Sequence, residues 1–314
     1  MDQDRPTLGI ALMLGFCLVA PMGDAVAKLL SGKVALGQLL LVRFGVQAIL
    51  LIPIIFMTGR IWRMNARVFN LTLLRTIMHI LGIGMMVSAL HYLPLADAIA
   101  IAFVMPFIML LLGYYVLGEE VGYRRLVACG VGFVGTLLVV QPSFQQVGWP
   151  ALLPIGVALN FALFMLVTRK IAKKTDPIGL QAVSGVMAIV IMTPAIFLVP
   201  DQFVPALSWD TALPSTTWGL LISIGLLGTL AHLLMTWSLR YAPSATVAPM
   251  QYLEIPIATV IGFAVFGDWP NTMASFGIAL VIASGLYIVI REQATSRRPA
   301  SAPVQERTFQ TAAE

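Results

Sequence analysis

Charged side chains interrupt several long apolar stretches of this sequence, and their chemistry is the most informative starting point. Glu254 lies about 16 Å along an apolar run that begins near residue 243, close to the middle of a bilayer if this run spans one. Pro249 and Pro256 flank it, and each removes a backbone donor and loosens a helix. Because ionisable groups within a span are costly and face a cavity or another helix, this carboxylate is predicted to bind a solute or a proton. A structural ion pair is the alternative.

Arg43 is the expected partner of this carboxylate. It lies about 12 Å from the outer end of the apolar run 36–58, at a depth comparable with that of Glu254. We predict that both side chains face one central cavity; snorkelling of Arg43 to the outer interface is the alternative. Gln47 and Gln251 lie one turn from Arg43 and Glu254 on the same helix faces, so they are further candidate solute contacts.

Five other residues complete the candidate set. Asp24 and Lys28 are spaced i, i+4, so they can pair along one helix face or contact the solute. Asp97 begins a later apolar run, where it can cap a helix or act at an outer gate. Phe103 and Tyr252, which are 149 residues apart, can stack on a planar solute or fill the core.

Histidine and cysteine spacings give no sign of catalysis or metal binding. His79, His91 and His232 lack the spacing of metal ligands, and Cys17 and Cys129 lie in apolar runs without a nearby base. No catalytic residue and no metal site is therefore predicted. His79 and His232 are expected to form interhelical hydrogen bonds, with a proton relay as the alternative.

The elements that must position these residues are membrane-spanning helices. Of the 314 residues, 59% are hydrophobic and 11% are charged, whereas a soluble domain carries roughly 25% charged residues. The lipid bilayer is therefore the expected surroundings. Since a hydrocarbon core about 30 Å thick requires about 20 apolar residues per helix, the apolar runs predict ten spans, over residues 8–30, 36–58, 70–92, 95–117, 124–141, 150–170, 178–199, 216–239, 243–266 and 271–290.

The basic residues predict how these spans are oriented. If the N-terminus is cytoplasmic, all of the 19 Lys and Arg residues except Lys28, Lys33 and Arg43 lie on the inner side or at inner helix ends. The positive-inside rule then places both the N- and the C-terminus in the cytoplasm of a multi-pass protein of the bacterial inner membrane. The same one-sided distribution argues that the net charge of +5 does not serve to bind nucleic acid.

The sequence also repeats itself at a shift of 149 residues. His91-Tyr92-Leu93-Pro94 corresponds to Arg240-Tyr241-Ala242-Pro243, and Gly118-Glu119 corresponds to Gly267-Asp268. Each half holds five spans, and an odd number inverts the second half in the membrane. Inverted repeats are a recurring plan of secondary transporters, with the solute near the midplane between the repeats; a duplication kept only for packing is the alternative. The predicted units are repeat one (8–142), repeat two (148–291) and a disordered cytoplasmic tail (292–314).

These motifs resemble the EamA family of the drug/metabolite transporter superfamily. The first half carries Leu90-x-x-x-Pro94, Pro106 and Leu117-Gly118-Glu119, and the second carries Leu239-x-x-x-Pro243, Pro256 and Phe266-Gly267-Asp268. The resemblance extends from about residue 8 to 290. It implies an all-α integral membrane protein with ten transmembrane helices in two inverted five-helix repeats, no cofactor and no ATP hydrolysis.

Two shorter stretches suggest a solute class. Pro249-x-x-Tyr252-x-Glu254 and Asp24-x-x-x-Lys28 are similar to stretches of family members that carry S-adenosylmethionine or riboflavin. The resemblance implies a secondary transporter, not an enzyme, that moves a vitamin such as riboflavin, an S-adenosylmethionine-like cation or an amino acid by alternating access. An intramembrane lipid-modifying enzyme and a non-transporting scaffold are the alternatives. Proton coupling through Glu254 and assembly as a homodimer are additional hypotheses.

Overall fold

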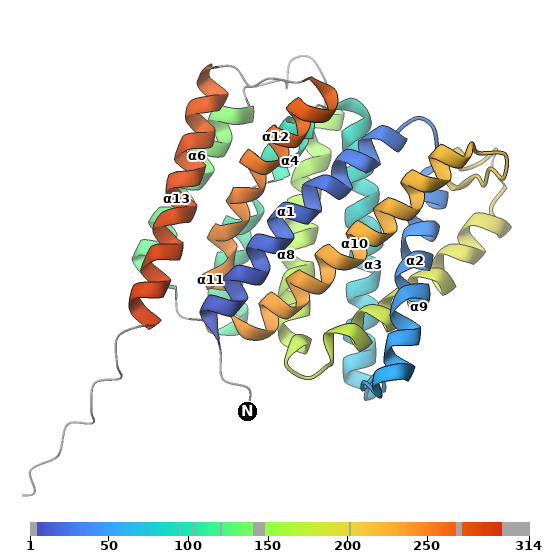
Figure 1. Ribbon diagram of the computed structural model, residues 1–314, viewed down its shortest axis with the longest axis horizontal. Coiled ribbons are helices and arrows are strands. Elements are labelled where there is room, and N and C mark those ends of the chain that lie inside the picture. Colours follow the sequence, from blue (N-terminus) through green and yellow to red (C-terminus); the bar gives the residue numbers. More distant parts are fainter. Residues whose placement is uncertain are drawn as a thin grey trace, which may run out of the picture.

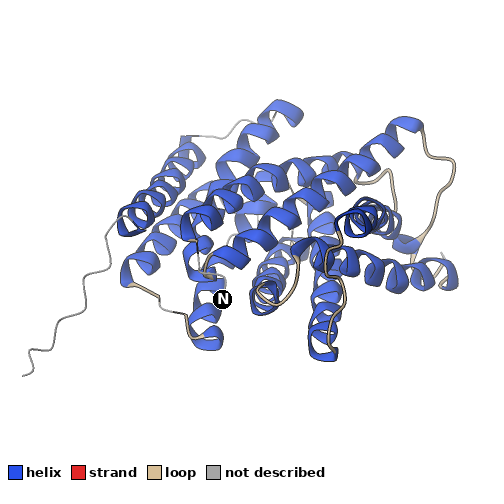
Figure 2. Ribbon diagram, turned by 60° about the horizontal axis from the view of Figure 1, so that its bottom comes forward, coloured by secondary structure: helices blue, strands red, loops and turns tan. Residues whose placement is uncertain are grey.

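The protein is helical throughout the part of the chain that the structure describes. The computed structural model describes residues 5–93, 95–102, 104–119, 121–140, 148–200, 202–267 and 272–296, and no strand occurs within these ranges (Figure 2). Seven segments are long and apolar enough to cross a bilayer, and shorter apolar helices lie at 107–117, 126–135 and 275–284. The elements are α1 (Pro6–Leu30), α2 (Leu36–Thr58), α3 (Ala66–Tyr92), α4 (Leu95–Ala102), α5 (Met105–Leu117), α6 (Tyr123–Val140), the 3₁₀ helix η1 (Trp149–Leu152), α8 (Leu153–Ala172), α9 (Pro177–Leu198), η2 (Pro205–Leu207), α10 (Ser215–Tyr241), α11 (Ser244–Val247), η3 (Ala248–Leu253), α12 (Glu254–Phe266) and α13 (Thr272–Ser296).

These elements form the ten predicted spans. Span four consists of α4 and α5, and span nine consists of α11, η3 and α12. Two helices extend beyond their predicted bounds by four residues or more. α3 begins at Ala66 because the Asn65 side chain accepts the backbone N–H of Val68 (2.9 Å) and caps the helix. α13 continues to Ser296, so residues 292–296 of the predicted tail are helical, and the remainder lies outside the described residues.

The contacts between the two halves follow a twofold relation. α1 packs along α10, and α3 packs along α8. Since α1 corresponds to α8 and α3 corresponds to α10, the twofold relation converts one of these contacts into the other. α2 packs on α9 and α6 packs on α13, so each of these spans contacts its own counterpart. In Figure 1 the pair α6 and α13 forms one edge of the molecule, while α2 and α9 lie at the other. The counterparts α3 and α10 are both 27 residues long. The two five-helix repeats are therefore inverted copies.

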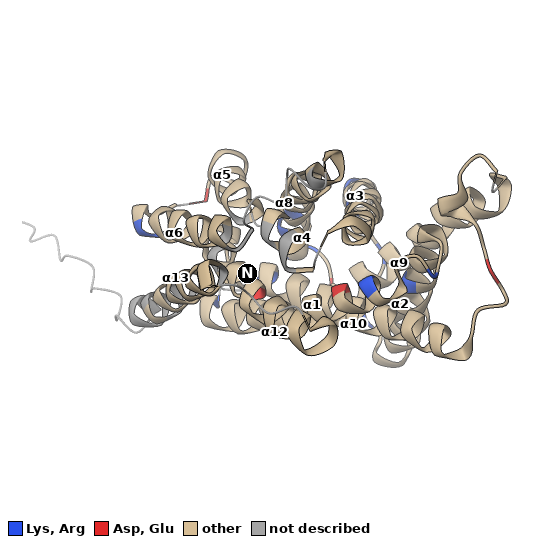
Figure 3. Cartoon of the chain, turned by 90° about the horizontal axis from the view of Figure 1, so that it is seen from above, with Lys and Arg blue, Asp and Glu red and all other residues tan. Residues whose placement is uncertain are grey.

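The N-terminal end of α1 and the C-terminal end of α13 lie on the same side of the molecule. α1 begins and α13 ends at the lower side of Figure 1, as an even number of spans requires. Seen from above, charged positions are few along the described helices (Figure 3). The membrane-spanning part is therefore apolar except at a small number of positions, which the helices must shield or use.

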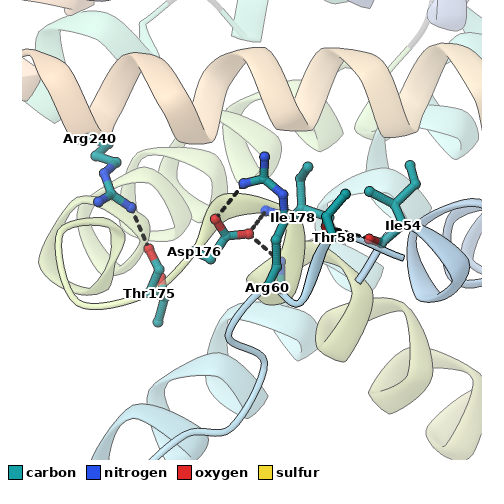
Figure 4. A network of polar contacts seen from close by, with 8 residues as sticks. Ile54, Thr58, Arg60, Thr175, Asp176, Ile178 and Arg240 are labelled. Atoms are coloured by element: carbon teal, nitrogen blue, oxygen red, sulfur yellow. Dashed lines mark hydrogen bonds and ion pairs between the residues drawn. The ribbon is translucent and has the colours of Figure 1, made fainter. Parts of the chain in front are cut away.

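One polar network fixes the turn between α8 and α9 (Figure 4). Asp176 accepts the backbone N–H of Ile178 (3.0 Å), which caps α9, and forms an ion pair with Arg60 after α2 (2.8 Å). Arg240, near the end of α10, donates to the carbonyl oxygen of Thr175 (2.8 Å). The network thus joins α2 of the first half to three helices of the second half.

A second network joins the halves at Glu119, the residue after the Gly that ends α5. Its carboxylate accepts the hydroxyl of Ser244 (2.6 Å) and the backbone N–H groups of Ser244 (3.2 Å) and Ala245 (3.0 Å), which open α11. Arg169 of α8 approaches the same carboxylate (Nε–Oε1 3.4 Å) and donates to the carbonyl oxygen of Leu239 (2.5 Å). A single side chain of the first half therefore holds the ends of three helices of the second.

Replacing Glu119 tests how much this network contributes to the stability of the fold. Glu119→Ala is expected to lower the free energy of unfolding by about 1–3 kcal/mol, because it leaves the backbone donors of α11 without their acceptor. Arg60→Ala is the control, since its partly exposed ion pair with Asp176 is worth only about 0–1 kcal/mol. Denaturation of the purified protein in detergent measures both. Equal losses in the two variants would contradict the assignment.

Candidate functional site

Spans four and nine are both broken near their middle, and the breaks position the site. Span nine changes from 3₁₀ helix to α-helix at Glu254, which is the first residue of α12, where the helix dipole favours a carboxylate. Pro256 follows in the first turn, where a missing N–H breaks no intrahelical bond. In span four, α5 begins at Met105, which lies 149 residues before Glu254. The two breaks are therefore counterparts in the two repeats.

A cavity of about 130 Å³ lies between the two halves. Its wall is formed by α1, α2, α3, α4 and α5 of the first half and by α8, α10 and α12 of the second. Met105 and Glu254, the residues at the two breaks, both contribute to it. Most of the remaining wall is apolar or aromatic. The polar side chains that line it are Asp24, Arg43, His79, His232 and Glu254.

Arg43 lines this cavity, and no described residue accepts a hydrogen bond from its guanidinium. The side chain is buried, with 9% of the residue exposed, and its guanidinium lies against the bare backbone of Gly228 in α10. A Cβ atom at Gly228 would lie 2.8 Å from Cζ, Nε and Nη2 of Arg43, so only glycine leaves room for this position. No residue that the structure describes offers the guanidinium an acceptor within hydrogen-bonding distance.

Two carboxylates share the cavity with Arg43. Asp24 of α1 is near enough to interact electrostatically with both Arg43 and Glu254. Glu254 is 8% exposed, and neither carboxylate receives a hydrogen bond from the described part of the chain. Uncompensated charge within a membrane span is unfavourable. The arrangement therefore provides three charged groups that a polar ligand or water in the cavity can satisfy.

His79 and His232 form a hydrogen bond across the repeat interface. Their Nε2 atoms are 2.9 Å apart, and both Nδ1 atoms are buried without a partner in the described structure. The bond joins α3 to α10, which are counterparts in the two repeats. It confirms the interhelical hydrogen bonding predicted for each histidine. The aromatic rings packed around the pair are those of Phe16, Phe44, Phe161 and Phe164.

Two glutamines proposed as solute contacts lie in helix interfaces instead of on the cavity wall. Gln47 donates through Nε2 to the carbonyl oxygen of Gln181 in α9 (2.6 Å). Gln251 is fully buried and donates to Sδ of Met165 in α8 (3.0 Å). One helical turn was expected to keep each on the same face as Arg43 or Glu254. However, α9 covers the face of α2 at Gln47, and α8 covers span nine at Gln251.

The other candidates are spread around the cavity. Tyr252 is fully buried and packs on the backbone of α6, and it is not a lining residue. Lys28 places its ammonium 4.9 Å from the centre of the Phe266 ring. Asp97 is the third residue of α4, and its side chain is outside the description. Phe103 lies outside the described residues. Of the predicted site residues, the structure brings Asp24, Arg43 and Glu254 together.

Sequence reasoning missed the role of Arg75. It was counted among the basic residues of the inner side, yet it lies about 14 Å along α3 and is fully buried. Its guanidinium donates to the hydroxyls of Thr168 (2.9 Å) and Ser184 (3.0 Å) and stands 4.5 Å from the centre of the Phe164 ring. These partners are neutral hydroxyls on α8 and α9, far from Arg75 in sequence. A search for an acidic partner in the sequence therefore could not find them.

The fold and this cavity define a class of protein. Ten helices in two inverted repeats, with broken spans beside a charged cavity at the repeat interface, are the architecture of secondary transporters. The chain belongs to the EamA-like transporter family, whose sequence model matches residues 7–141 and 148–290. It is therefore a multi-pass membrane protein of the drug/metabolite transporter superfamily.

Several relatives have assigned solutes. The chain is 31% identical to the riboflavin transporter of Rhizobium johnstonii over 73% of this chain and 72% of that one. It is 26% identical to the riboflavin transporter of Vibrio cholerae, covering 94% and 97%, and 24% identical to the S-adenosylmethionine uptake transporter of Rickettsia bellii, covering 91% and 95%. One crystal structure, 15% identical, matches 93% of this chain and all of its own with a TM-score of 0.69, which shows the fold alone.

The histidine pair predicts a non-additive effect on stability. His79→Leu or His232→Leu alone is expected to lower the free energy of unfolding by about 1–3 kcal/mol, because the remaining imidazole keeps a buried polar atom without its partner. The double variant is expected to lose less than the sum of the two, since both polar groups are gone. Denaturation in detergent measures the cycle, with the exposed His91→Leu as control. Strict additivity would mean that the bond contributes nothing.

Proposed function

We propose that this protein is a secondary transporter that moves a small organic metabolite across the bacterial inner membrane by alternating access. The repeats 8–142 and 148–291 would rock against each other around the cavity that contains Asp24, Arg43 and Glu254, with both termini in the cytoplasm. The observation that carries the proposal is the set of three ionisable side chains that line one interface cavity without a hydrogen bond from the described residues. A bundle kept only for packing gains nothing from such groups.

The size of the cavity supports a cycle of conformations. Pockets for drug-sized ligands measure about 300–1,000 Å³, whereas the cavity between these halves measures about 130 Å³. In the proposed cycle, the helices on one side separate to admit a metabolite of that size. The broken spans four and nine are suited to this movement because their midpoints lack continuous α-helical hydrogen bonding.

The relatives narrow the solutes worth testing. Riboflavin and S-adenosylmethionine are the solutes that give the similar proteins their names. The cavity suits compounds of this kind, since Phe16 and Phe161 stack on its wall (6.4 Å between centroids) beside charged groups. An amino acid is a third candidate, because it carries charges of both signs.

Uptake by proteoliposomes tests the proposal directly. Vesicles that contain the protein are expected to exchange radiolabelled riboflavin or S-adenosylmethionine by counterflow, while protein-free vesicles do not. Asp24→Asn is expected to reduce exchange about tenfold or more, because hydrogen bonds to a charged group contribute about 1.5–3 kcal/mol. Asp210→Asn is the matched control, since Asp210 lies in a loop and caps the backbone of Ala212. Lipid turnover without flux of any metabolite would instead favour an intramembrane enzyme.

Glu254 is the proposed site of proton coupling. Glu254→Gln keeps the size of the side chain but cannot gain or lose a proton. It is expected to weaken counterflow exchange of the labelled solute, because the negative charge is lost, and in addition to abolish accumulation driven by an imposed pH gradient. Flux measured at several values of pH on each side of the vesicle checks this, with Asp210→Asn again as the control. Full activity with an unchanged pH dependence would exclude Glu254 as the coupling group.

A further inference from the structure

The guanidinium of Arg43 combines three features that rarely occur together in a membrane span. It is buried, it lies against the backbone of Gly228, and it lines the cavity without an acceptor in the described chain. Arg75 shows the contrasting arrangement, since hydroxyls of Thr168 and Ser184 accept two of its hydrogen bonds. Two donors of Arg75 are thus used by the protein, although its Nη2 atom is buried without a partner in the described structure, whereas no described residue accepts a hydrogen bond from Arg43.

The chemistry of a guanidinium restricts that ligand. Its planar fork of N–H donors matches the two oxygens of a carboxylate or phosphate. The guanidinium lies against the backbone of Gly228, and no described residue accepts a hydrogen bond from its donors. A dianionic phosphate would also meet Asp24 and Glu254 in the same cavity and be repelled by them. A single carboxylate adds less negative charge, and a positive group on the same solute would offset it.

We propose that Arg43, held in place by Gly228, is the subsite for a carboxylate of the transported solute, and that Asp24 and Glu254 bind a positively charged part of the same molecule. The inference rests on the proposed transport function and deepens it. The solute is a zwitterion, with the positive group toward α1 and α12 and the carboxylate toward α2 and α10. Gly228 is a positioning residue, because it acts on the solute only through Arg43.

Matched ligands test the carboxylate subsite. S-adenosylmethionine and decarboxylated S-adenosylmethionine differ in the carboxylate and share the positive groups. The wild-type protein in detergent is expected to bind the first about 10- to 100-fold more tightly, the effect of hydrogen bonds to a charged group. Arg43→Gln is expected to abolish this ratio, and Arg43→Lys, which keeps the charge without the planar fork, to reduce it. Thermal shift and competition against labelled S-adenosylmethionine measure the ratio.

Gly228→Ala tests whether the position of the Arg43 guanidinium matters, because this variant still contains Arg43. Its methyl group displaces the guanidinium, so the ratio between the two ligands should fall as in Arg43→Gln although Arg43 remains. Gly23→Ala is the matched control, because it adds the same group to the cavity wall at ordinary contact with Leu227 (3.9 Å) and does not touch Arg43. Gly23→Ala is expected to keep the ratio.

The outcomes distinguish this inference from the transport function itself. Transport of riboflavin, which has no carboxylate, without binding of S-adenosylmethionine would overturn the subsite and leave the transporter intact. Riboflavin 5′-phosphate bound more tightly than riboflavin in an Arg43-dependent way would show a phosphate subsite and also overturn it. Equal losses for both matched ligands in Arg43→Gln would reduce Arg43 to a structural role. Absence of flux for every compound would overturn the transport function and the subsite with it.

Discussion

The structure depends on one constraint, namely that a charge inside a bilayer needs a polar partner or a wet cavity. The chain meets this constraint in two ways. Arg75 donates to hydroxyls of α8 and α9 and lies beside an aromatic ring, so it joins α3 to these helices, although its Nη2 atom has no described partner. Asp24, Arg43 and Glu254 have no such partners and surround a cavity instead. The proposed solute contacts are the groups without hydrogen bonds from the described chain.

The twofold relation between the repeats explains why this cavity lies where it does. Counterpart breaks in spans four and nine bring Met105 and Glu254 to its wall, and counterpart helices α3 and α10 bring His79 and His232 into contact. The two halves are equivalent in backbone but not in side chains. Glutamate faces the cavity in one half where methionine faces it in the other. The resulting site is asymmetric, which suits a solute whose two ends differ in charge.

The networks outside the cavity connect the halves at their ends. Glu119 caps α11 and approaches Arg169, and Asp176 pairs with Arg60, so both networks cross from one repeat to the other. These two networks lie away from the cavity, whereas the His79–His232 hydrogen bond joins the repeats on its wall.

The sequence by itself determined the ten spans, their repeat and the charged residues that must face inward, because apolar length and the cost of buried charge act locally along the chain. It also placed Glu254 beside a helix break through its flanking prolines. Only the tertiary structure decided which polar residues meet the cavity. Gln47 and Gln251 share faces with Arg43 and Glu254 but are covered by α9 and α8. Gly228 and the pairing of His79 with His232 depend on helices more than 150 residues apart in sequence, and only packing brings those together.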